Sequence, residues 1–180
     1  MAARQDETRI LDDRSRGTPG PGLARYLEEH WRLATALGAA VIIIATLIAY
    51  IPAMRAGFVW DDDDYVTNNG LLTSWDGLQR IWFDVLPHPT EYDLPQYYPM
   101  THTSFWVEYR IWGLNPVGYH VVNVCLHIIN ALLVWLLLRK LGVPGAWLAA
   151  TLFALHPINV ESVAWIAERK NVLSLMFVLS

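Results

Sequence analysis

Residues 33–53 read Leu-Ala-Thr-Ala-Leu-Gly-Ala-Ala-Val-Ile-Ile-Ile-Ala-Thr-Leu-Ile-Ala-Tyr-Ile-Pro-Ala, and four consecutive aspartates, Asp61 to Asp64, follow within ten residues. The first stretch has 21 residues and no charged side chain. About 20 apolar residues in a helix are enough to cross the hydrocarbon core of a bilayer. The stretch therefore predicts a retained membrane-spanning helix, since it is too long and starts too late for a cleaved signal peptide.

The acidic run lies within Phe58–Val66, which is predicted to sit at the edge of the membrane. Carboxylates crowded beside a low-dielectric region repel one another, so we expect at least one of them to have a raised pKa. Such a carboxylate can accept a proton or bind a divalent metal ion. The alternative interpretation is a solvated acidic turn that only ends the helix.

The composition is that of an integral membrane protein with sizeable aqueous loops. Hydrophobic residues make up 54% of the 180, nine residues are tryptophan, and only 17% are charged. No basic patch indicates a nucleic-acid partner. Cys125 is the single cysteine, so no disulfide can form within the chain.

Further apolar runs predict an all-α, polytopic membrane protein with about four spans. The third run has only thirteen apolar residues, so a re-entrant or broken helix is the alternative there. A fourth helix is cut off at Ser180, and we expect the chain to be a fragment. The predicted order is a disordered tail at 1–32, spans at 33–53, 119–138 and 143–157, loops at 54–118 and 158–170, and the start of a fourth span at 171–180.

The basic residues predict the orientation. Arg25 and Arg32 flank the first span, and Arg139-Lys140 fill the turn after the second. By the positive-inside rule these segments face the cytoplasm, so the N-terminus is cytoplasmic and the loops at 54–118 and 158–170 lie outside. Arg169-Lys170 then lie on the outer side, against the rule, which suggests a functional role for them.

The loop at 54–118 is too long and too aromatic for a simple connector. Aromatic and aliphatic residues recur at helical spacing over 75–82, behind Thr73 or Ser74 as N-cap, and again over 105–112. We expect two amphipathic helices on the membrane surface, where tryptophan and tyrosine are favoured. The rings could also line a groove for a lipid or a sugar.

The predicted second span carries a polar face made of His120, Asn123, His127 and Asn130. Polar side chains within a bilayer usually face other helices. We expect Asn123 and Asn130 to form hydrogen bonds between helices. A metal-ligating role for His127 is the alternative, although no paired ligand is evident in the sequence.

A second polar constellation follows the third span. His156-Pro157 interrupts that span, and a short helix can restart at Asn159 with Glu161 in its first turn. Glu161 and Glu168 are seven residues apart, which would place them on one helical face. They could pair with Arg169 and Lys170, or form acidic sites on the outer side of the membrane.

Four motifs in this order resemble a known family. They are Trp60-Asp-Asp-Asp-Asp-Tyr-Val66, Tyr97-Tyr-Pro-Met-Thr-His-Thr-Ser104, Gly113-Leu-Asn-Pro-Val-Gly-Tyr-His-Val-Val-Asn123, and the run from His156 to Ser174. Together they resemble bacterial multi-pass membrane proteins with C-terminal tetratricopeptide repeats. Those proteins are related to the transmembrane and tetratricopeptide-containing O-mannosyltransferases of the GT-C glycosyltransferase class. The similarity covers residues 50–180, and no repeat of about 34 residues is visible in this chain.

The resemblance implies a glycosyltransferase of the bacterial inner membrane. It would move a sugar such as mannose from a polyprenyl-phosphate donor to a protein or other hydroxyl acceptor on the outer face. Asp61 maps onto the catalytic base and Asp62 onto its acidic neighbour. Glu161, with Asp62, would hold a divalent metal ion, Mg²⁺ or Mn²⁺, or organise the acceptor site.

The resemblance also implies substrate contacts. Arg169 and Lys170 would bind the donor phosphate, since cationic side chains suit a phosphate in a partly desolvated site. His156 and Glu168 complete the predicted substrate-binding set. Relatives often have a second histidine at the position of Asn159, and tyrosine at that of Trp60, so this chain departs from the pattern at both.

Two other classes of function remain open from the sequence. A cation transporter or channel would need acidic residues inside its spans, where this chain has only histidine and asparagine. A non-catalytic membrane scaffold presenting C-terminal repeats would tolerate alanine at the aspartates. In contrast, the glycosyltransferase requires them.

Overall fold

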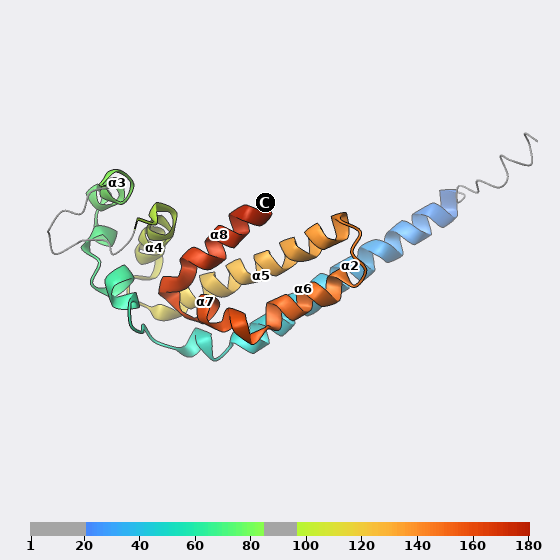
Figure 1. Ribbon diagram of the computed structural model, residues 1–180, viewed down its shortest axis with the longest axis horizontal. Helices are drawn as coiled ribbons and strands as arrows, with labels where there is room; N and C mark the ends of the chain where they lie inside the picture. The colour runs from blue at the N-terminus through green and yellow to red at the C-terminus, as the bar shows by residue number, and fades with distance from the viewer. Residues whose placement is uncertain (1–20, 85–96) are drawn as a thin grey trace, which may run out of the picture. The chain divides into compact units, whose positions relative to one another are not determined.

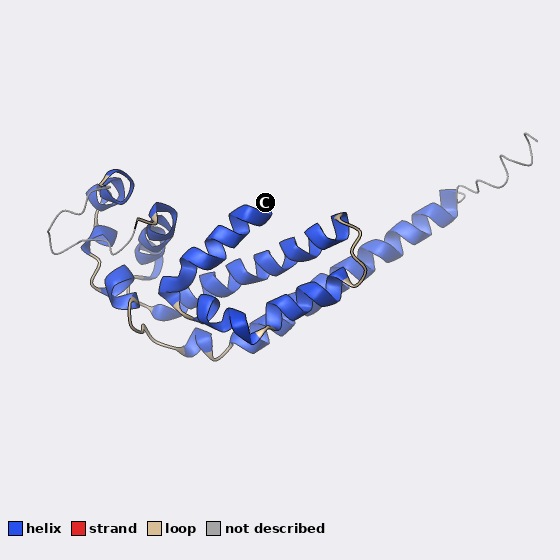
Figure 2. Cartoon of the chain, viewed as in Figure 1, coloured by secondary structure: helices blue, strands red, loops and turns tan. Residues whose placement is uncertain are grey.

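The computed structural model describes residues 21–84 and 97–180, and within these ranges every regular element is a helix (Figure 2). The chain divides into two compact units, Met1–Gly38 and Ala39–Ser180. The described part of the first unit is the beginning of the long helix α2. The longer elements are α2 (Pro21–Tyr50), α3 (Trp75–Phe83), α4 (Pro99–Trp112), α5 (Pro116–Lys140), α6 (Ala146–Leu155), α7 (Val160–Ala164) and α8 (Arg169–Leu179). Short helical turns are η1 (Ala53–Arg55), η2 (Asp63–Thr67), η3 (Gly70–Thr73), η4 (Pro157–Asn159) and η5 (Ile166–Glu168).

Helix α2 begins earlier and ends earlier than the predicted span. It takes in the stretch before Leu33, where Arg32 pairs with Glu28 four residues away at 2.6 Å, and it ends at Tyr50. Pro52 follows the end of α2, and proline cannot donate the backbone hydrogen bond that would continue a helix. The first twenty residues of the predicted tail lie outside the described residues.

Two helices of the described chain are long and apolar enough to cross a membrane. They are Glu28–Tyr50 within α2 and Pro116–Lys140, which is α5. Helix α6 is apolar but has only ten residues, and α8 has eleven. The third and fourth spans therefore stay predictions, while the all-helical fold is confirmed for the described residues.

Helix α5 is the centre of the second unit, with α6 along one side and α8 along another (Figure 1). Ala131 and Trp135 of α5 pack against Ile42 of α2 and against three buried alanines of α6, Ala146, Ala150 and Ala154. Small residues at a helix interface let the backbones approach closely. This explains why α6 carries alanine at every fourth position toward α5.

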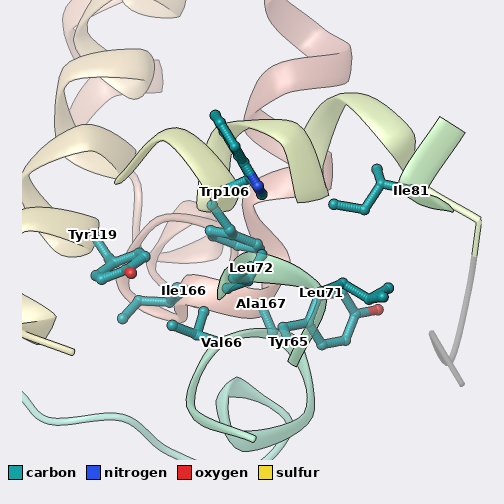
Figure 3. Close-up of a cluster of buried hydrophobic side chains, with 10 residues drawn as sticks. Tyr65, Val66, Leu71, Leu72, Ile81, Trp106, Tyr119, Ile166 and Ala167 are labelled. Atoms are coloured by element: carbon teal, nitrogen blue, oxygen red, sulfur yellow. The ribbon is translucent and has the colours of Figure 1, made fainter. Parts of the chain in front are cut away.

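The described parts of the predicted outer loop, residues 54–84 and 97–115, fold into a compact cap over the first turns of α5. Its core, drawn in Figure 3, joins residues of η2, η3, α3 and α4 to Tyr119 of α5 and to η5. The members are Tyr65, Val66, Leu71, Leu72, Ile81, Phe105, Trp106, Tyr119, Ile166 and Ala167. The predicted loop that carries the aspartates and the predicted loop that carries Glu161 and Glu168 thus share one hydrophobic core.

Both helices predicted within this loop are present. The hydroxyl of Ser74 accepts the N–H of Gly77 at 2.9 Å and caps α3, so Ser74 is the N-cap. In α3, Ile81 is buried whereas Trp75 is 70% exposed, as an amphipathic helix requires. In α4, Phe105 and Trp106 are buried in the cap. These two rings therefore fill the core of the cap, while the location of both helices at the membrane surface stays a prediction.

The segment after α6 follows the predicted break but not the predicted face. Helix α6 ends at Leu155, His156 is extended, and α7 starts after Asn159. However, Trp165 is also extended (φ −87°, ψ 121°), which separates α7 from η5. Glu161 and Glu168 are therefore on different elements, and the prediction that they share one helical face is wrong.

Candidate functional site

Asp62 connects the acidic turn to the second polar segment. Its side chain is fully buried, and its two carboxylate oxygens accept the backbone N–H of Val59 at 2.9 Å and of Ala167 at 2.8 Å. Burial raises the pKa of Asp62, and the two backbone donors partly oppose that shift. The expected raised carboxylate pKa is thus found at Asp62, where the carboxylate holds two loops together.

Asp61 is placed differently. Its side chain is exposed, and its backbone carbonyl accepts the N–H groups of Asp64 and Tyr65 at 3.1 and 3.0 Å. The preceding residue, Trp60, has a positive φ of 49° and is 78% exposed, a conformation uncommon for a bulky residue. The turn therefore buries Asp62 and presents Asp61 outward. Of the two predicted catalytic carboxylates, Asp61 is the one that a substrate can reach.

Arg169 is enclosed by protein, contrary to the substrate contact predicted for it. Its side chain is 0% exposed and donates to Asn123 Oδ1 at 2.7 Å and to the carbonyl of Tyr119 at 2.9 Å. Nη1 donates to Ser104 Oγ at 3.1 Å and to the carboxylate of Glu108. Because these contacts use the N–H donors of the planar guanidinium, Arg169 has a structural role that connects several segments of the chain.

Glu108 is the residue that the sequence reasoning missed. It lies on α4, is buried, and forms an ion pair with Arg169 across 61 residues. Burial raises the pKa of Glu108 to about 7, although the positive charge of Arg169 acts in the opposite direction. Two features of the sequence could have suggested the pair. Glu108 is the single acidic residue of an aromatic helix, and Arg169 lies on the predicted outer side, where the positive-inside rule disfavours arginine.

Lys170 points away from the buried side chain of Arg169. Its ammonium lies 2.9 Å from Glu168 Oε1 and 5.6 Å from the ring centres of both Tyr65 and Tyr98. Asn171 donates to Glu168 Oε2 at 2.6 Å, which fixes the carboxylate from the other side. Lys170 and Glu168, predicted as substrate contacts, are therefore brought together beside two tyrosines.

Tyr65 lies beside this ion pair. Burial raises the pKa of the Tyr65 hydroxyl, the charge of Lys170 lowers it, and the charges of Asp61 and Glu168 raise it further. The ammonium of Lys170 is 5.6 Å from the centre of the Tyr65 ring, and the backbone N–H of Tyr65 donates to the carbonyl of Asp61 at 3.0 Å. Tyr65 thus links the backbone of the first loop at Asp61 to the Lys170–Glu168 pair of the second loop.

A groove of about 330 Å³ opens beside Lys170, between the start of α4 and α8. Lys170, Asn171 and Ser174 are its polar residues on α8, and the rest of its lining is mainly apolar or aromatic. The lining residues are Tyr97, Tyr98, Pro99, Met100, Thr101, Lys170, Asn171, Leu173, Ser174 and Phe177.

The two predicted metal ligands, Asp62 and Glu161, differ in exposure, since Asp62 is buried and Glu161 is exposed in the first turn of α7. His156, a predicted substrate contact, accepts the N–H of Ile158 at 3.2 Å and caps η4. Both oxygens of Asp62 already accept backbone hydrogen bonds. Within 21–84 and 97–180, no group of three or more His, Cys, Asp or Glu side chains is arranged to hold a metal ion. The divalent metal ion implied by the resemblance stays a prediction.

The polar face of α5 forms the predicted contacts between helices. Asn123 Oδ1 accepts the Nε–H of Arg169, the first residue of α8, at 2.7 Å, and its amide nitrogen donates to the carbonyl of Trp165, between α7 and η5, at 3.2 Å. Asn130 donates to the carbonyl of Val172 in α8 at 2.8 Å. His127 Nε2 lies 3.0 Å from the carbonyl of Ala154. These bonds confirm the expectation for both asparagines and give His127 a structural contact.

Two helices long and apolar enough to cross a membrane, with a polar cluster at the start of α5, are typical of a helical membrane protein. Comparison with known proteins identifies its relatives. Protein O-mannosyl-transferase TMTC2 of Homo sapiens is 37% identical over 142 residues, which are 74% of this chain and 17% of that protein. The protein O-mannosyl-transferase tmtc2 of Xenopus laevis is 36% identical over 140 residues, 74% of this chain and 16% of its own length. The chain is related to these TMTC-type O-mannosyl-transferases.

Protein O-mannosyl-transferase Tmtc1 of Drosophila melanogaster is 33% identical over 134 residues, 71% of this chain and 15% of that protein. The chain therefore spans only about a sixth of the length of the three relatives. No family model and no solved structure matches the chain.

Proposed function

We propose that this chain is part of a membrane glycosyltransferase of the GT-C type. It transfers a sugar, with mannose as the first candidate, from a polyprenyl-phosphate donor to a hydroxyl group of a protein. The reaction takes place on the extracytoplasmic side of a membrane that the chain crosses about four times, with its N-terminus in the cytoplasm. The relatives named as O-mannosyl-transferases support the class, and the bacterial inner membrane is the proposed location.

The hydrogen bond between Asp62 and the N–H of Ala167 is the observation that carries the proposal. It joins the two predicted outer loops and leaves Asp61 exposed, four residues before Tyr65, whose ring Lys170 contacts. Sugar transfer with inversion needs one carboxylate base aligned with the acceptor hydroxyl. A polyprenyl-phosphate donor also needs a cationic contact at the level of the membrane.

In this mechanism Asp61 accepts the proton of the acceptor hydroxyl. The hydroxyl oxygen forms a bond to the anomeric carbon, and the bond from that carbon to the phosphate oxygen breaks. The electron pair leaves with the polyprenyl phosphate, whose negative charge Lys170 stabilises. Glu168 orients Lys170, and Arg169 is removed from the phosphate-binding set because its donors are used inside the protein.

The groove beside Lys170 supports the choice of a lipid-linked donor. Its polar end holds an ammonium group, and Met100, Leu173 and Phe177 give it an apolar wall. That combination suits a phosphate with a hydrocarbon chain attached. No step of this mechanism is assigned to a metal ion.

The test uses the full-length protein in proteoliposomes, with polyprenyl-phosphate mannose labelled in the sugar and a peptide rich in serine and threonine. We expect the label to move from lipid to peptide, and guanosine-diphosphate mannose to be inactive as a donor. Transfer from the nucleotide sugar alone would reject the lipid-linked donor. No transfer from either donor would favour the non-catalytic scaffold.

A further inference from the structure

The segment Trp165–Arg169 is held from three directions. Asp62 of the acidic turn accepts the N–H of Ala167, and Asn123 of α5 donates to the carbonyl of Trp165. From α4, Glu108 binds the guanidinium of Arg169. Each contact comes from a different part of the chain, so the position of this segment depends on the tertiary fold and not on local sequence.

Two neighbouring cations at the end of this segment, Arg169 and Lys170, differ in exposure. The side chain of Arg169 is 0% exposed, whereas that of Lys170 keeps 21% of its surface accessible beside Glu168. Adjacent residues at the start of a helix point in directions about 100° apart, because a helix has 3.6 residues per turn. Fixing Arg169 inward therefore fixes the direction in which Lys170 points.

The contacts of Arg169 are those of an anchor. Its guanidinium carbon lies 4.5 Å from the centre of the Phe105 ring, and its nitrogens donate to three other groups besides Glu108. Lysine could keep the positive charge but not the planar fork, since its three donors radiate from one nitrogen. The arrangement is specific for arginine.

We infer that the Glu108–Arg169 pair is a positioning device that fixes Lys170, with its partner Glu168, beside Tyr65 and the groove. Glu108 and Arg169 are positioning residues, because neither faces the groove and both act through the segment 165–170. The catalytic part of this inference rests on the proposed function. The positional part can be measured without any activity.

Two variants of the full-length protein test the inference. Arg169→Lys keeps a charge beside Glu108 but loses the fork. Glu108→Leu with Arg169→Met replaces the buried pair by apolar side chains of similar size, a change that commonly preserves folding. The matched control is Arg80→Met with Asp84→Leu, which removes an ion pair that is partly exposed on α3.

The first readout is amide hydrogen exchange of peptides covering 165–169. We expect exchange at least tenfold faster in both variants, with α5 peptides and the Arg80–Asp84 control unchanged. The second readout is steady-state transfer from the labelled lipid donor. We expect kcat to fall about 100-fold, the usual consequence of misplacing reacting groups by about 1 Å, while the KM for the acceptor peptide stays within threefold.

The outcomes separate the two proposals. Unchanged exchange over 165–169 would overturn the positioning role, as would faster exchange with an unchanged kcat. Loss of the folded protein in both variants would overturn it too, because the pair would then hold the whole fold. Faster exchange in a protein whose wild type transfers no sugar would support the positional part and reject the proposed function.

Discussion

The carboxylate of Asp62 accepts the backbone N–H of Ala167 at 2.8 Å, although the two residues are 105 positions apart. Because an amide N–H is not changed by substitution of the Ala167 side chain, the contact depends on Asp62 and on the backbone path of the second loop. Asp61, the residue before Asp62, is exposed. Neighbouring aspartates therefore have separate roles, which single substitutions can tell apart.

Asp61→Asn is expected to abolish transfer in the full-length enzyme while leaving expression and thermal stability unchanged. The amide keeps the shape of the side chain but cannot accept the proton, and loss of a general base typically costs 10²–10⁴-fold in rate. The assay is initial velocity with the lipid-linked donor. Asp64→Asn, on the same exposed turn, serves as the control, and near-normal turnover of Asp61→Asn would reject Asp61 as the base.

Asp62→Asn is expected to lower stability. One of its two accepting oxygens becomes an N–H₂ group that faces a backbone donor in a buried site. An unmade buried hydrogen bond costs about 1–3 kcal/mol. Thermal or denaturant unfolding of the detergent-solubilised protein measures the change, and Asp63→Asn, whose residue is exposed, is the comparison. Equal stability of the two variants would contradict the buried contact.

Stability should depend on pH through Glu108. Its pKa is raised by burial to about 7 in the folded protein from 4.5, so the folded state binds the proton more tightly. This contribution is fully present below about pH 4.5 and is lost as pH rises through about 7. The 2.5-unit difference corresponds to about 3 kcal/mol at most.

Glu108→Gln removes that titration. The stability of the wild type relative to this variant should fall between pH 4.5 and 7.5, as measured by unfolding at several pH values. A difference in stability that stays constant across this range would show that Glu108 does not titrate there.

Gly77→Ala is expected to destabilise the cap, although alanine in a helix is normally more stable than glycine by about 1 kcal/mol. A Cβ at this position would lie 2.0 Å from the carbonyl oxygen of Leu71, which is backbone and cannot rotate away. Overpacking of this kind costs about 1–3 kcal/mol. Gly22→Ala, with nothing within 4 Å, is the matched helical control. A Gly77→Ala protein as stable as the control would contradict the close approach of η3 to α3.

The proposed orientation can be tested by cysteine labelling in a Cys125→Ser background. Thr73→Cys, on an exposed position of the predicted outer loop, should react with an impermeant maleimide in intact cells. Leu141→Cys, exposed in the turn after α5, should react only after the membrane is permeabilised. The reverse pattern would invert the topology and place Asp61 in the cytoplasm.

The sequence alone determined the features that depend on local patterns. Uninterrupted apolar runs predicted α2 and α5, and helical spacing behind Ser74 predicted α3, because each signal lies within one or two turns of chain. The His156-Pro157 break was also local, since proline removes a backbone donor. The similarity of ordered motifs likewise pointed to the O-mannosyl-transferases before any contact was known.

Only the tertiary structure decided which polar residues are buried and what they contact. Asp61 and Asp62 are indistinguishable in a run of four aspartates, yet the fold buries one and exposes the other. Arg169 and Lys170 are neighbours with the same charge. Contacts with distant residues, among them Glu108, 61 residues away, turn Arg169 inward. These outcomes depend on pairings between distant segments, and the free energy of burying a charge is set by partners that no local pattern contains.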